Sequence, residues 1–358
     1  MRIDLMDEME SGNRWCVLFN FETSGCNFSY ITKLLNQNPL LIMNDKKTIA
    51  VLGATGAQGG SLAYAILNDK NSPYKVRAIT RNPDSDKAKD LVNAGADVVV
   101  ADMDNKDSLK KAFKGAYGVY AVTNFWEHFS PQKETNQAKN IALAAKEAGV
   151  KHLIWSSFED TREKVPLSDN RMPTLQYHYK VPHFDSKGEA NKFFKEMGVP
   201  ATLLYTSFYW DNFIYFGMAP KRGEDGVLGI TMPMRDKKLP GMAAEDIGKC
   251  AYGIFKAGDK YINKTVGIAG EHLTGAQMAE GFTKALGQKV VYNDVPAEMY
   301  RSFGFPGADD LGNMFQYKAD FNQEYCSARS LNESKALNPE LKTFDAWLAA
   351  NKGRIPLE

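Results

Sequence analysis

A regular alternation of β-rich and helical segments begins at residue 46 and constrains the fold of this chain more than any other feature. Strands are predicted at 48–52, 74–80, 96–101, 118–123, 152–156 and 201–205, and helices at 61–67, 107–113, 131–148 and 184–197. Successive parallel strands need a helix between them because their crossover is right-handed. The alternation therefore predicts the α/β class, with a Rossmann-type doubly wound parallel sheet covered by helices on both faces.

The alternation loosens after residue 205, where glycine and proline become frequent over 217–240. A helix and a seventh strand are still predicted there, at 245–256 and 265–269. We expect a Rossmann domain over 46–205 and a smaller C-terminal α/β lobe over 206–358 that contacts a substrate or partner. Within that lobe, 244–270 is expected to return to the main sheet.

The first 45 residues lack the character of the rest of the chain. Their start is acidic and has neither the basic segment and apolar run of a secretory signal nor the arginines of a mitochondrial presequence. Met43 and the polar residues after it resemble an ordinary start shortly before the first strand. We expect residues 1–45 to be a disordered extension, or 1–42 to be an alternative start outside the natural protein.

The composition argues against several classes of partner. Lys and Arg number 44 against 43 Asp and Glu, a net charge of +1, whereas nucleic-acid and membrane surfaces usually attract a basic face. The four cysteines are too scattered for a disulfide scaffold or a zinc site, and we interpret them as reduced packing thiols. These patterns predict a cytoplasmic protein with no metal, no direct nucleic-acid contact and no membrane contact.

A glycine-rich turn directly follows the first predicted strand. Gly53 permits a sharp turn, Gly56 lets the backbone approach a pyrophosphate, and Gly59 allows a helix to pack closely on a strand. Free N–H groups at the start of the next helix then face the phosphates. The residues predicted to hold a dinucleotide pyrophosphate are Gly53, Ala54, Thr55, Gly56, Ala57, Gln58 and Gly59. The alternative is a tight turn that holds no ligand.

The end of the second strand favours NADP(H) over NAD(H). An acidic residue there would bind a ribose 2′-hydroxyl, but this chain has Arg81, whose guanidinium can hold a 2′-phosphate with two hydrogen bonds. A plain surface arginine is the alternative. By topology, Asp102 is expected beside the adenine and Thr123, Asn124 and Phe125 beside the nicotinamide ribose, because ligands lie beyond the carboxyl ends of parallel strands.

The catalytic pair of a short-chain dehydrogenase is incomplete. Such an enzyme needs a tyrosine four residues before a lysine, on one helix face, so that the lysine lowers the pKa of the phenol. Here Lys187 is present, but His183 holds the tyrosine position, while Ser156 or Ser157 could supply the serine. Three interpretations stay open: Lys187 only anchors the cofactor ribose, His183 replaces tyrosine as the acid of a reductase, or the site binds no cofactor.

Several motifs together resemble the NmrA-like family, and within it the subgroup found in vertebrates. They are GATGAQGGS at 53–61, RNP at 81–83, TNFWE at 123–127, HFDSKGE at 183–189 and FPGADDLGNMF at 305–315. The resemblance implies an atypical short-chain dehydrogenase fold without the active tyrosine. Members of the family that the chain resembles bind NADP(H) and act as redox sensors or transcriptional regulators. The 305–315 segment is interpreted as a lid or interface loop.

The resemblance also assigns the cofactor contacts. Arg81 would hold the 2′-phosphate and Lys187 the nicotinamide ribose. The other residues carried over are Asn82 and Pro83 beside Arg81, Met103 beside Asp102 at the adenine, and Phe208, Tyr209, Trp210 and Asp211 at the nicotinamide end. Asp84 and Asp86 depart from the family pattern of basic residues there and would weaken the preference for NADP(H), leaving NAD(H) possible.

An intact dinucleotide site without the proton-donating tyrosine predicts an NADP(H)-binding redox sensor or regulator. It would signal through a cofactor-dependent conformation or association, with a regulatory protein partner that the sequence does not name or with a second copy of the chain. The main alternative is an NADPH-dependent reductase of small carbonyl or quinone compounds, with His183 or water as the acid and Lys187 in the site. A third possibility is an interaction protein without a cofactor. The family resemblance adds the nucleus as a possible second location.

Overall fold

The computed structural model describes residues 46–357, and the predictions made for residues 1–45 lie outside this part of the chain. Its centre is a seven-stranded parallel sheet in the order β11-β6-β5-β4-β1-β2-β3. The strands are β1 (Lys47–Leu52), β2 (Tyr74–Thr80), β3 (Asp97–Val100), β4 (Gly118–Ala121), β5 (His152–Ser157), β6 (Ala201–Tyr205) and β11 (Thr265–Gly267). The chain order reverses between β1 and β4, which creates the crevice where doubly wound sheets bind ligands. The predicted Rossmann-type fold is confirmed.

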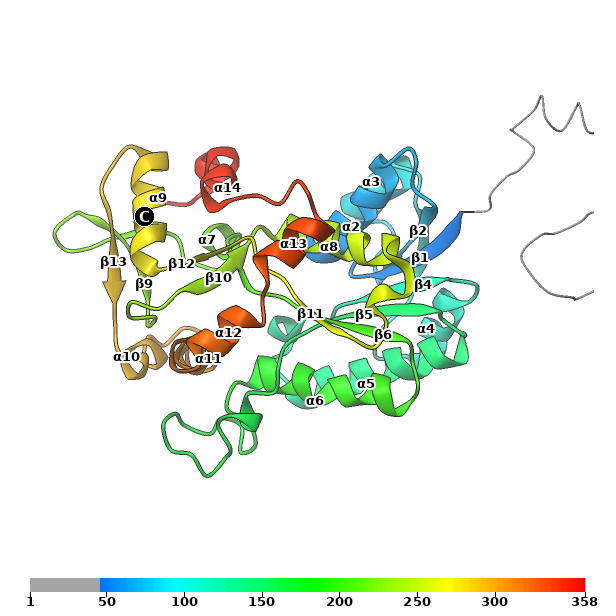
Figure 1. The fold of residues 1–358 in the computed structure, drawn as a ribbon, viewed down its shortest axis with the longest axis horizontal. Coiled ribbons are helices and arrows are strands. Elements are labelled where there is room, and N and C mark those ends of the chain that lie inside the picture. Colours follow the sequence, from blue (N-terminus) through cyan, green and yellow to red (C-terminus); the bar gives the residue numbers. More distant parts are fainter. Residues whose placement is uncertain (1–45, 358) are drawn as a thin grey trace, which may run out of the picture. The chain divides into compact units, whose positions relative to one another are not determined.

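Helices cover both faces of this sheet (Figure 1). One face carries α2 (Ala57–Asn68) and α8 (Ala244–Lys256), whose apolar side chains form one core with the strands. The other carries α4 (Lys106–Phe113), α5 (Pro131–Glu147) and α6 (Pro182–Glu196), which share a second core. The remaining helices near the sheet are α3 (Asp86–Asn93) and α13 (Leu331–Leu337). The strands β4 and β5 are buried along their whole length because both faces of the sheet are covered.

The loosened region after residue 205 builds two small sheets and several helices around a third core. Its strands are β7 (Phe208–Tyr209), β8 (Lys221–Arg222), β9 (Leu228–Met232), β10 (Leu239–Met242), β12 (Glu271–Leu273) and β13 (Val290–Asp294). Its helices are α7 (Asn212–Tyr215), α9 (Gly275–Leu286), α10 (Ala297–Arg301), α11 (Ala308–Asp320), α12 (Asn322–Ser327) and α14 (Phe344–Asn351). Phe213, Phe282 and Trp347 lie in this core.

Two parts of the sequence interpretation change here. The glycine- and proline-rich stretch over 217–240, for which no element was predicted, contains the strands β8 and β9 and the start of β10. The segment 305–315 is not a loop, because most of it is the first half of α11, whose Asn313 and Phe315 are buried. No helix within residues 46–357 is long and apolar enough to cross a membrane.

Candidate dinucleotide site

The glycine turn after β1 has the geometry of a phosphate-binding loop. Gly53 has a φ of +65°, a conformation that favours glycine, and a Cβ added at Gly59 would lie 2.4 Å from the carbonyl oxygen of Gly53. Helix α2 begins at Ala57 without a side-chain cap and without an acidic residue in its first turn. Its first N–H groups are therefore free to bind an anion, and the residues present fit a dinucleotide pyrophosphate.

A cavity of about 760 Å³ opens from this turn across the carboxyl ends of the strands. The predicted site residues that line it are Gly53, Thr55, Gly56, Ala57, Gln58, Gly59, Arg81, Asn82, Met103, Thr123, Asn124, Phe125, His183, Lys187, Phe208, Tyr209 and Asp211. Four predicted residues, Ala54, Pro83, Asp102 and Trp210, do not line it.

Trp210 and Asp102 have structural roles instead. The indole of Trp210 is 1% exposed and packs on Phe344 and Trp347 in the C-terminal core, so it does not reach the cavity at which the nicotinamide end was predicted. The Asp102 carboxylate accepts a hydrogen bond from the N–H of Asp104 at 2.9 Å, which shapes the turn after β3. Asp211 both lines the cavity and accepts a hydrogen bond from the N–H of Ala244 at the start of α8.

Gln58 links the glycine turn to three other elements. Its Oε1 accepts hydrogen bonds from the hydroxyls of Tyr120 at 2.6 Å and Ser156 at 2.8 Å, and its Nε2 donates to the Tyr209 hydroxyl at 2.6 Å. The hydroxyl of Ser157 donates instead to Asn191 of α6 at 2.7 Å. Of the two candidate serines, only Ser156 lines the cavity.

Arg81 lies at the mouth of the cavity and is paired with a carboxylate. Its Nη1 and Nη2 donate to Oε1 and Oε2 of Glu127 at 2.7 and 3.0 Å, a two-bond arrangement that matches the way a guanidinium holds a phosphate. The hydrogen bonds from Arg81 are the first cause of a lowered pKa at Glu127. Lys87 lines the same cavity, whereas neither Asp84 nor Asp86 does. The two carboxylates that weakened the case for a 2′-phosphate thus lie outside the cavity wall.

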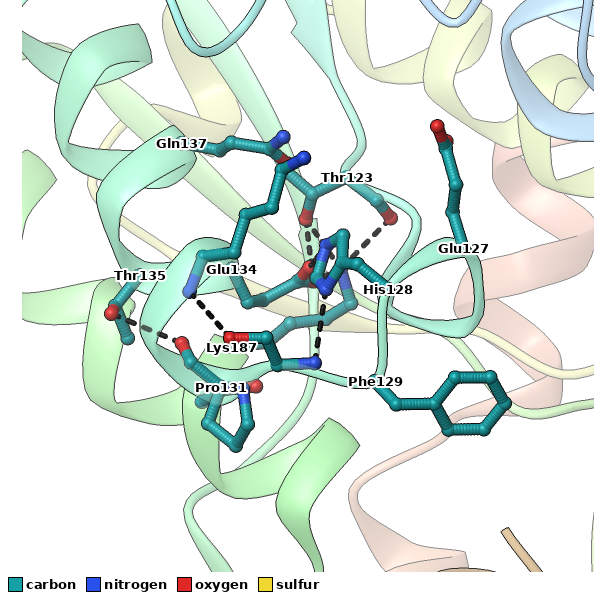
Figure 2. A network of polar contacts seen from close by, with 12 residues as sticks. Thr123, Glu127, His128, Phe129, Pro131, Glu134, Thr135, Gln137 and Lys187 are labelled. Carbon is teal, nitrogen blue, oxygen red and sulfur yellow. Dashed lines mark hydrogen bonds and ion pairs between the residues drawn. The ribbon is translucent and has the colours of Figure 1, made fainter. Parts of the chain in front are cut away.

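Lys187 is held in a buried network that Figure 2 shows. Its ammonium donates to the Thr123 carbonyl at 3.0 Å, to the Thr123 hydroxyl at 2.6 Å and to Oε1 of Glu134. An ammonium has three hydrogen atoms, so these acceptors occupy all of its donors. The Thr123 hydroxyl in turn donates to Glu134 at 2.6 Å, and Nε2 of His128 lies 3.5 Å from the second Glu134 oxygen.

The charge on Glu134 depends on this network. Burial alone would raise the pKa of this fully buried carboxyl, but the Lys187 ammonium, with help from His128 and Thr123, lowers the pKa to about 2. The carboxylate therefore stays ionised inside the protein. A cofactor ribose reaches Lys187 only by displacing one of its present acceptors.

His183 is paired with a buried acid. Its Nδ1 lies 2.6 Å from Oδ1 of Asp310 on α11, and its backbone N–H donates to Oδ2 of the same residue at 3.1 Å. The imidazole packs against Trp126 with ring centroids 4.8 Å apart. Its Nε2 has no hydrogen-bond partner within residues 46–357, and His183 lines the cavity. The arrangement leaves one ring nitrogen free to exchange a proton with a ligand.

Sequence reasoning missed the three carboxylates that set the state of these basic residues: Glu127, Glu134 and Asp310. Glu134 lies in the first turn of α5, where an acidic residue is ordinary, and Asp310 is 127 positions away from His183. The TNFWE and FPGADDLGNMF motifs contain Glu127 and Asp310, so the resemblance marked their segments but not their roles.

The family model for the NmrA-like family matches residues 45–348. An NmrA-like family domain-containing oxidoreductase, FrzB, of Cladobotryum sp is 31% identical over 290 residues, which cover 75% of this chain and 83% of that protein. An NmrA-like family domain-containing protein of Dictyostelium discoideum is 30% identical over 266 residues, covering 72% and 83%. The likeness to the vertebrate subgroup stays a prediction.

Solved structures with similar folds include a regulator and an enzyme. The negative transcriptional regulator NmrA superposes with a TM-score of 0.70 at 23% identity and covers 85% of this chain and 95% of its own. The triphenylmethane reductase of Citrobacter sp. superposes with a TM-score of 0.65 at 19% identity, covering 85% and 99%. The match of the family model over most of residues 46–357 shows that this chain belongs to the NmrA-like family.

Proposed function

We propose that this chain is an NADP(H)-binding regulatory protein that reports cofactor binding through the loops after β2 and β4. The free start of α2, the glycine turn and the placement of Arg81 and Lys87 on the cavity wall support binding of a phosphorylated dinucleotide. Related structures point the same way: NmrA has been solved with NADP and with NAD, and the triphenylmethane reductase with NADP(H).

The Arg81–Glu127 pair is the observation that carries this proposal. A 2′-phosphate and the Glu127 carboxylate compete for the same face of the guanidinium, so NADP(H) separates a pair that NAD(H) leaves intact. Glu127 ends the short helix η2 (Phe125–Glu127), and this helix also carries Trp126. Release of Glu127 therefore acts on the segment that holds the indole.

Trp126 connects that segment to the surface. Its ring contacts Phe129 and Phe216 with centroids 5.7 and 5.4 Å apart, and these two side chains are 39% and 42% exposed. A Cβ added at Gly307, just before α11, would lie 2.8 Å from the Trp126 ring. Movement of Trp126 thus alters an exposed aromatic surface on which a partner protein or a second copy of the chain can bind.

The lysine of the incomplete catalytic pair favours regulation over turnover. Lys187 has all three donors engaged by Thr123 and Glu134, and no tyrosine lies four residues before it. The proton-transfer pair of a short-chain dehydrogenase is therefore not assembled. A ligand signal also requires that NADP(H) bind the two loop arrangements with different affinities, which competition with Glu127 provides.

The test compares the full chain without cofactor and with saturating NADPH, NADP⁺ or NAD⁺. We expect the phosphorylated cofactors to change protease cleavage near 125–130, or the mass measured by light scattering after gel filtration, and NAD⁺ to change neither. Calorimetric titration of each cofactor establishes saturation. The proposal is abandoned if NADPH and NADP⁺ bind and leave both readouts unchanged.

A second function, reduction of a carbonyl or quinone compound, is favoured by the His183–Asp310 pair. NADPH would supply the hydride to the carbonyl carbon, and His183 would donate the proton to the oxygen while Asp310 stabilises the imidazolium. Oxidation of NADPH, followed as the loss of its absorbance at about 340 nm, measures this activity with each of a panel of carbonyl compounds. His183→Gln should abolish it without changing NADPH affinity, and an unaffected variant would exclude His183 as the acid.

A further inference from the structure

One wall of the cavity contains a buried lysine that the dinucleotide does not explain. Lys318 of α11 is 2% exposed and lines the cavity together with Phe184, Met314 and Phe315. Its ammonium contacts the sulfur of Met314 at 3.2 Å. No carboxylate or carbonyl oxygen within residues 46–357 accepts a hydrogen bond from it.

Aromatic rings replace only part of the hydration energy that this ammonium loses on burial. The ring centroids of Phe184, Phe315 and Tyr325 lie 5.3, 5.7 and 5.4 Å from Nζ. Each such cation–π contact stabilises the charge by less than its removal from water costs. Burial and the nearby Arg329 accordingly lower the pKa of Lys318 to about 7.

The nearest acidic group is already neutralised. Both oxygens of Glu159 accept hydrogen bonds from the fully buried Arg329, at 3.2 and 2.8 Å. Glu159, Arg329 and protonated Lys318 together leave one positive charge in excess. A ligand that brings one negative charge to Lys318 would compensate this excess.

A second polar side chain that lines the same cavity also lacks a partner. The hydroxyl of Ser207, a residue 3% exposed that follows β6, is buried and makes no hydrogen bond within residues 46–357. Buried hydroxyls are normally paired, because an unpaired one destabilises the fold. Both Lys318 and Ser207 can donate to an oxygen placed in the cavity.

The walls around these two donors are flat and apolar. Phe158 and Phe184 stack with centroids 4.0 Å apart and planes within 5°, and both line the cavity, as do Phe208 and Phe315. Rings at these positions favour a planar aromatic ligand over a branched aliphatic one. We propose that this wall of the cavity binds an aromatic carboxylic acid, whose carboxylate accepts hydrogen bonds from Lys318 and Ser207. The proposal goes beyond the regulatory function and does not depend on it.

Titration of the NADP⁺-saturated full chain with 2-naphthoate, followed by calorimetry, tests this site. We expect 2-naphthoate to bind and the neutral amide of equal shape, 2-naphthamide, to bind about tenfold or more weakly, because hydrogen bonds to a charged group are stronger. Lys318→Met should weaken the binding of 2-naphthoate by about the same factor and leave the affinity for 2-naphthamide unchanged. Ser207→Ala should have a smaller effect in the same direction.

Two controls establish that a loss of binding belongs to Lys318 itself. Lys284→Met removes an exposed lysine of α9 that pairs with Glu280, and it should leave 2-naphthoate binding unchanged. Lys318→Met should also unfold at a higher urea concentration than the wild type, since it replaces a buried, poorly compensated charge with an apolar chain. Equal binding of 2-naphthoate to wild type and Lys318→Met would overturn the proposal, as would equal binding of the acid and the amide. Loss of NADP⁺ binding in Lys318→Met would assign the lysine to the cofactor instead and equally overturn it.

Discussion

Two pairs of a cation and a glutamate hold cations that line the same cavity, Lys187 and Arg81, and the pairs differ mainly in burial. The side chains of Lys187 and Glu134 are 8% and 0% exposed, whereas those of Arg81 and Glu127 are 56% and 43% exposed. Water and salt screen the second pair, so its partners exchange easily, but separation of the first leaves a bare charge inside the protein. We therefore expect the buried pair to hold the loop after β4 in place, and we propose that the exposed pair is the one that responds to ligand.

The largest expected effect follows from removal of one member of the buried pair. Lys187→Met leaves the Glu134 carboxylate buried with only Thr123 and His128 beside it, and should lower the free energy of unfolding by about 3–5 kcal/mol. Urea denaturation measures the change. The double variant Lys187→Met, Glu134→Gln removes both charges and should recover a large part of the loss. If the single variant were as stable as the wild type, the pair would have no role in holding the loop.

Acid should remove more stability through the buried pair than through the exposed one. The pKa of Glu134 is lowered from 4.5 to about 2 in the folded protein, so its ionised form stabilises the fold above pH 4.5 and this contribution is lost as the pH falls toward 2. We expect the wild type to lose more stability between pH 5 and pH 3 than the double variant Lys187→Met, Glu134→Gln, in unfolding measured at about these pH values. Parallel curves for the two proteins would contradict the lowered pKa.

The sequence predicted the part of the fold in which local pattern and topology agree. Strands such as β2 and β6 lie at their predicted positions because short apolar runs between helices have few other ways to be buried. The glycine turn and Arg81 were found for the same reason, since both occupy fixed places at the ends of strands. Motif and topology together therefore placed one side of the cavity.

The other side of the cavity could not be predicted from motif and topology. Lys318, Asp310 and Glu134 acquire their roles from neighbours far along the chain, and a charged residue on a helix is ordinarily interpreted as a solvated one. Trp210 shows the opposite error: an aromatic residue beside predicted ligand contacts packs in the core formed by Phe344 and Trp347. Neither outcome follows from spacing alone, because burial depends on elements that pack only in the folded protein.

The smallest expected effect concerns the exposed pair and tests its role directly. Glu127→Gln keeps the size of the side chain and removes the charge that competes with a 2′-phosphate for Arg81. Exposed pairs of this kind are worth about 0.2–1 kcal/mol, so NADP⁺ should bind about one and a half to five times more tightly while NAD⁺ affinity stays the same. Calorimetric titration at low and high salt measures both affinities.

The matched variant Arg81→Gln should weaken the binding of NADP⁺ more than that of NAD⁺. It also distinguishes two roles for Glu127: competition with the phosphate for Arg81, and orientation of the Arg81 guanidinium. If Glu127 competes with the phosphate, the gain in Glu127→Gln requires Arg81 and disappears when both residues are replaced. The gain should also shrink at high salt, because the guanidinium and its partners are exposed to screening ions. Weaker NADP⁺ binding in Glu127→Gln would show that the carboxylate orients Arg81 for the phosphate, and the exposed pair would then be a fixed part of the site like its buried counterpart.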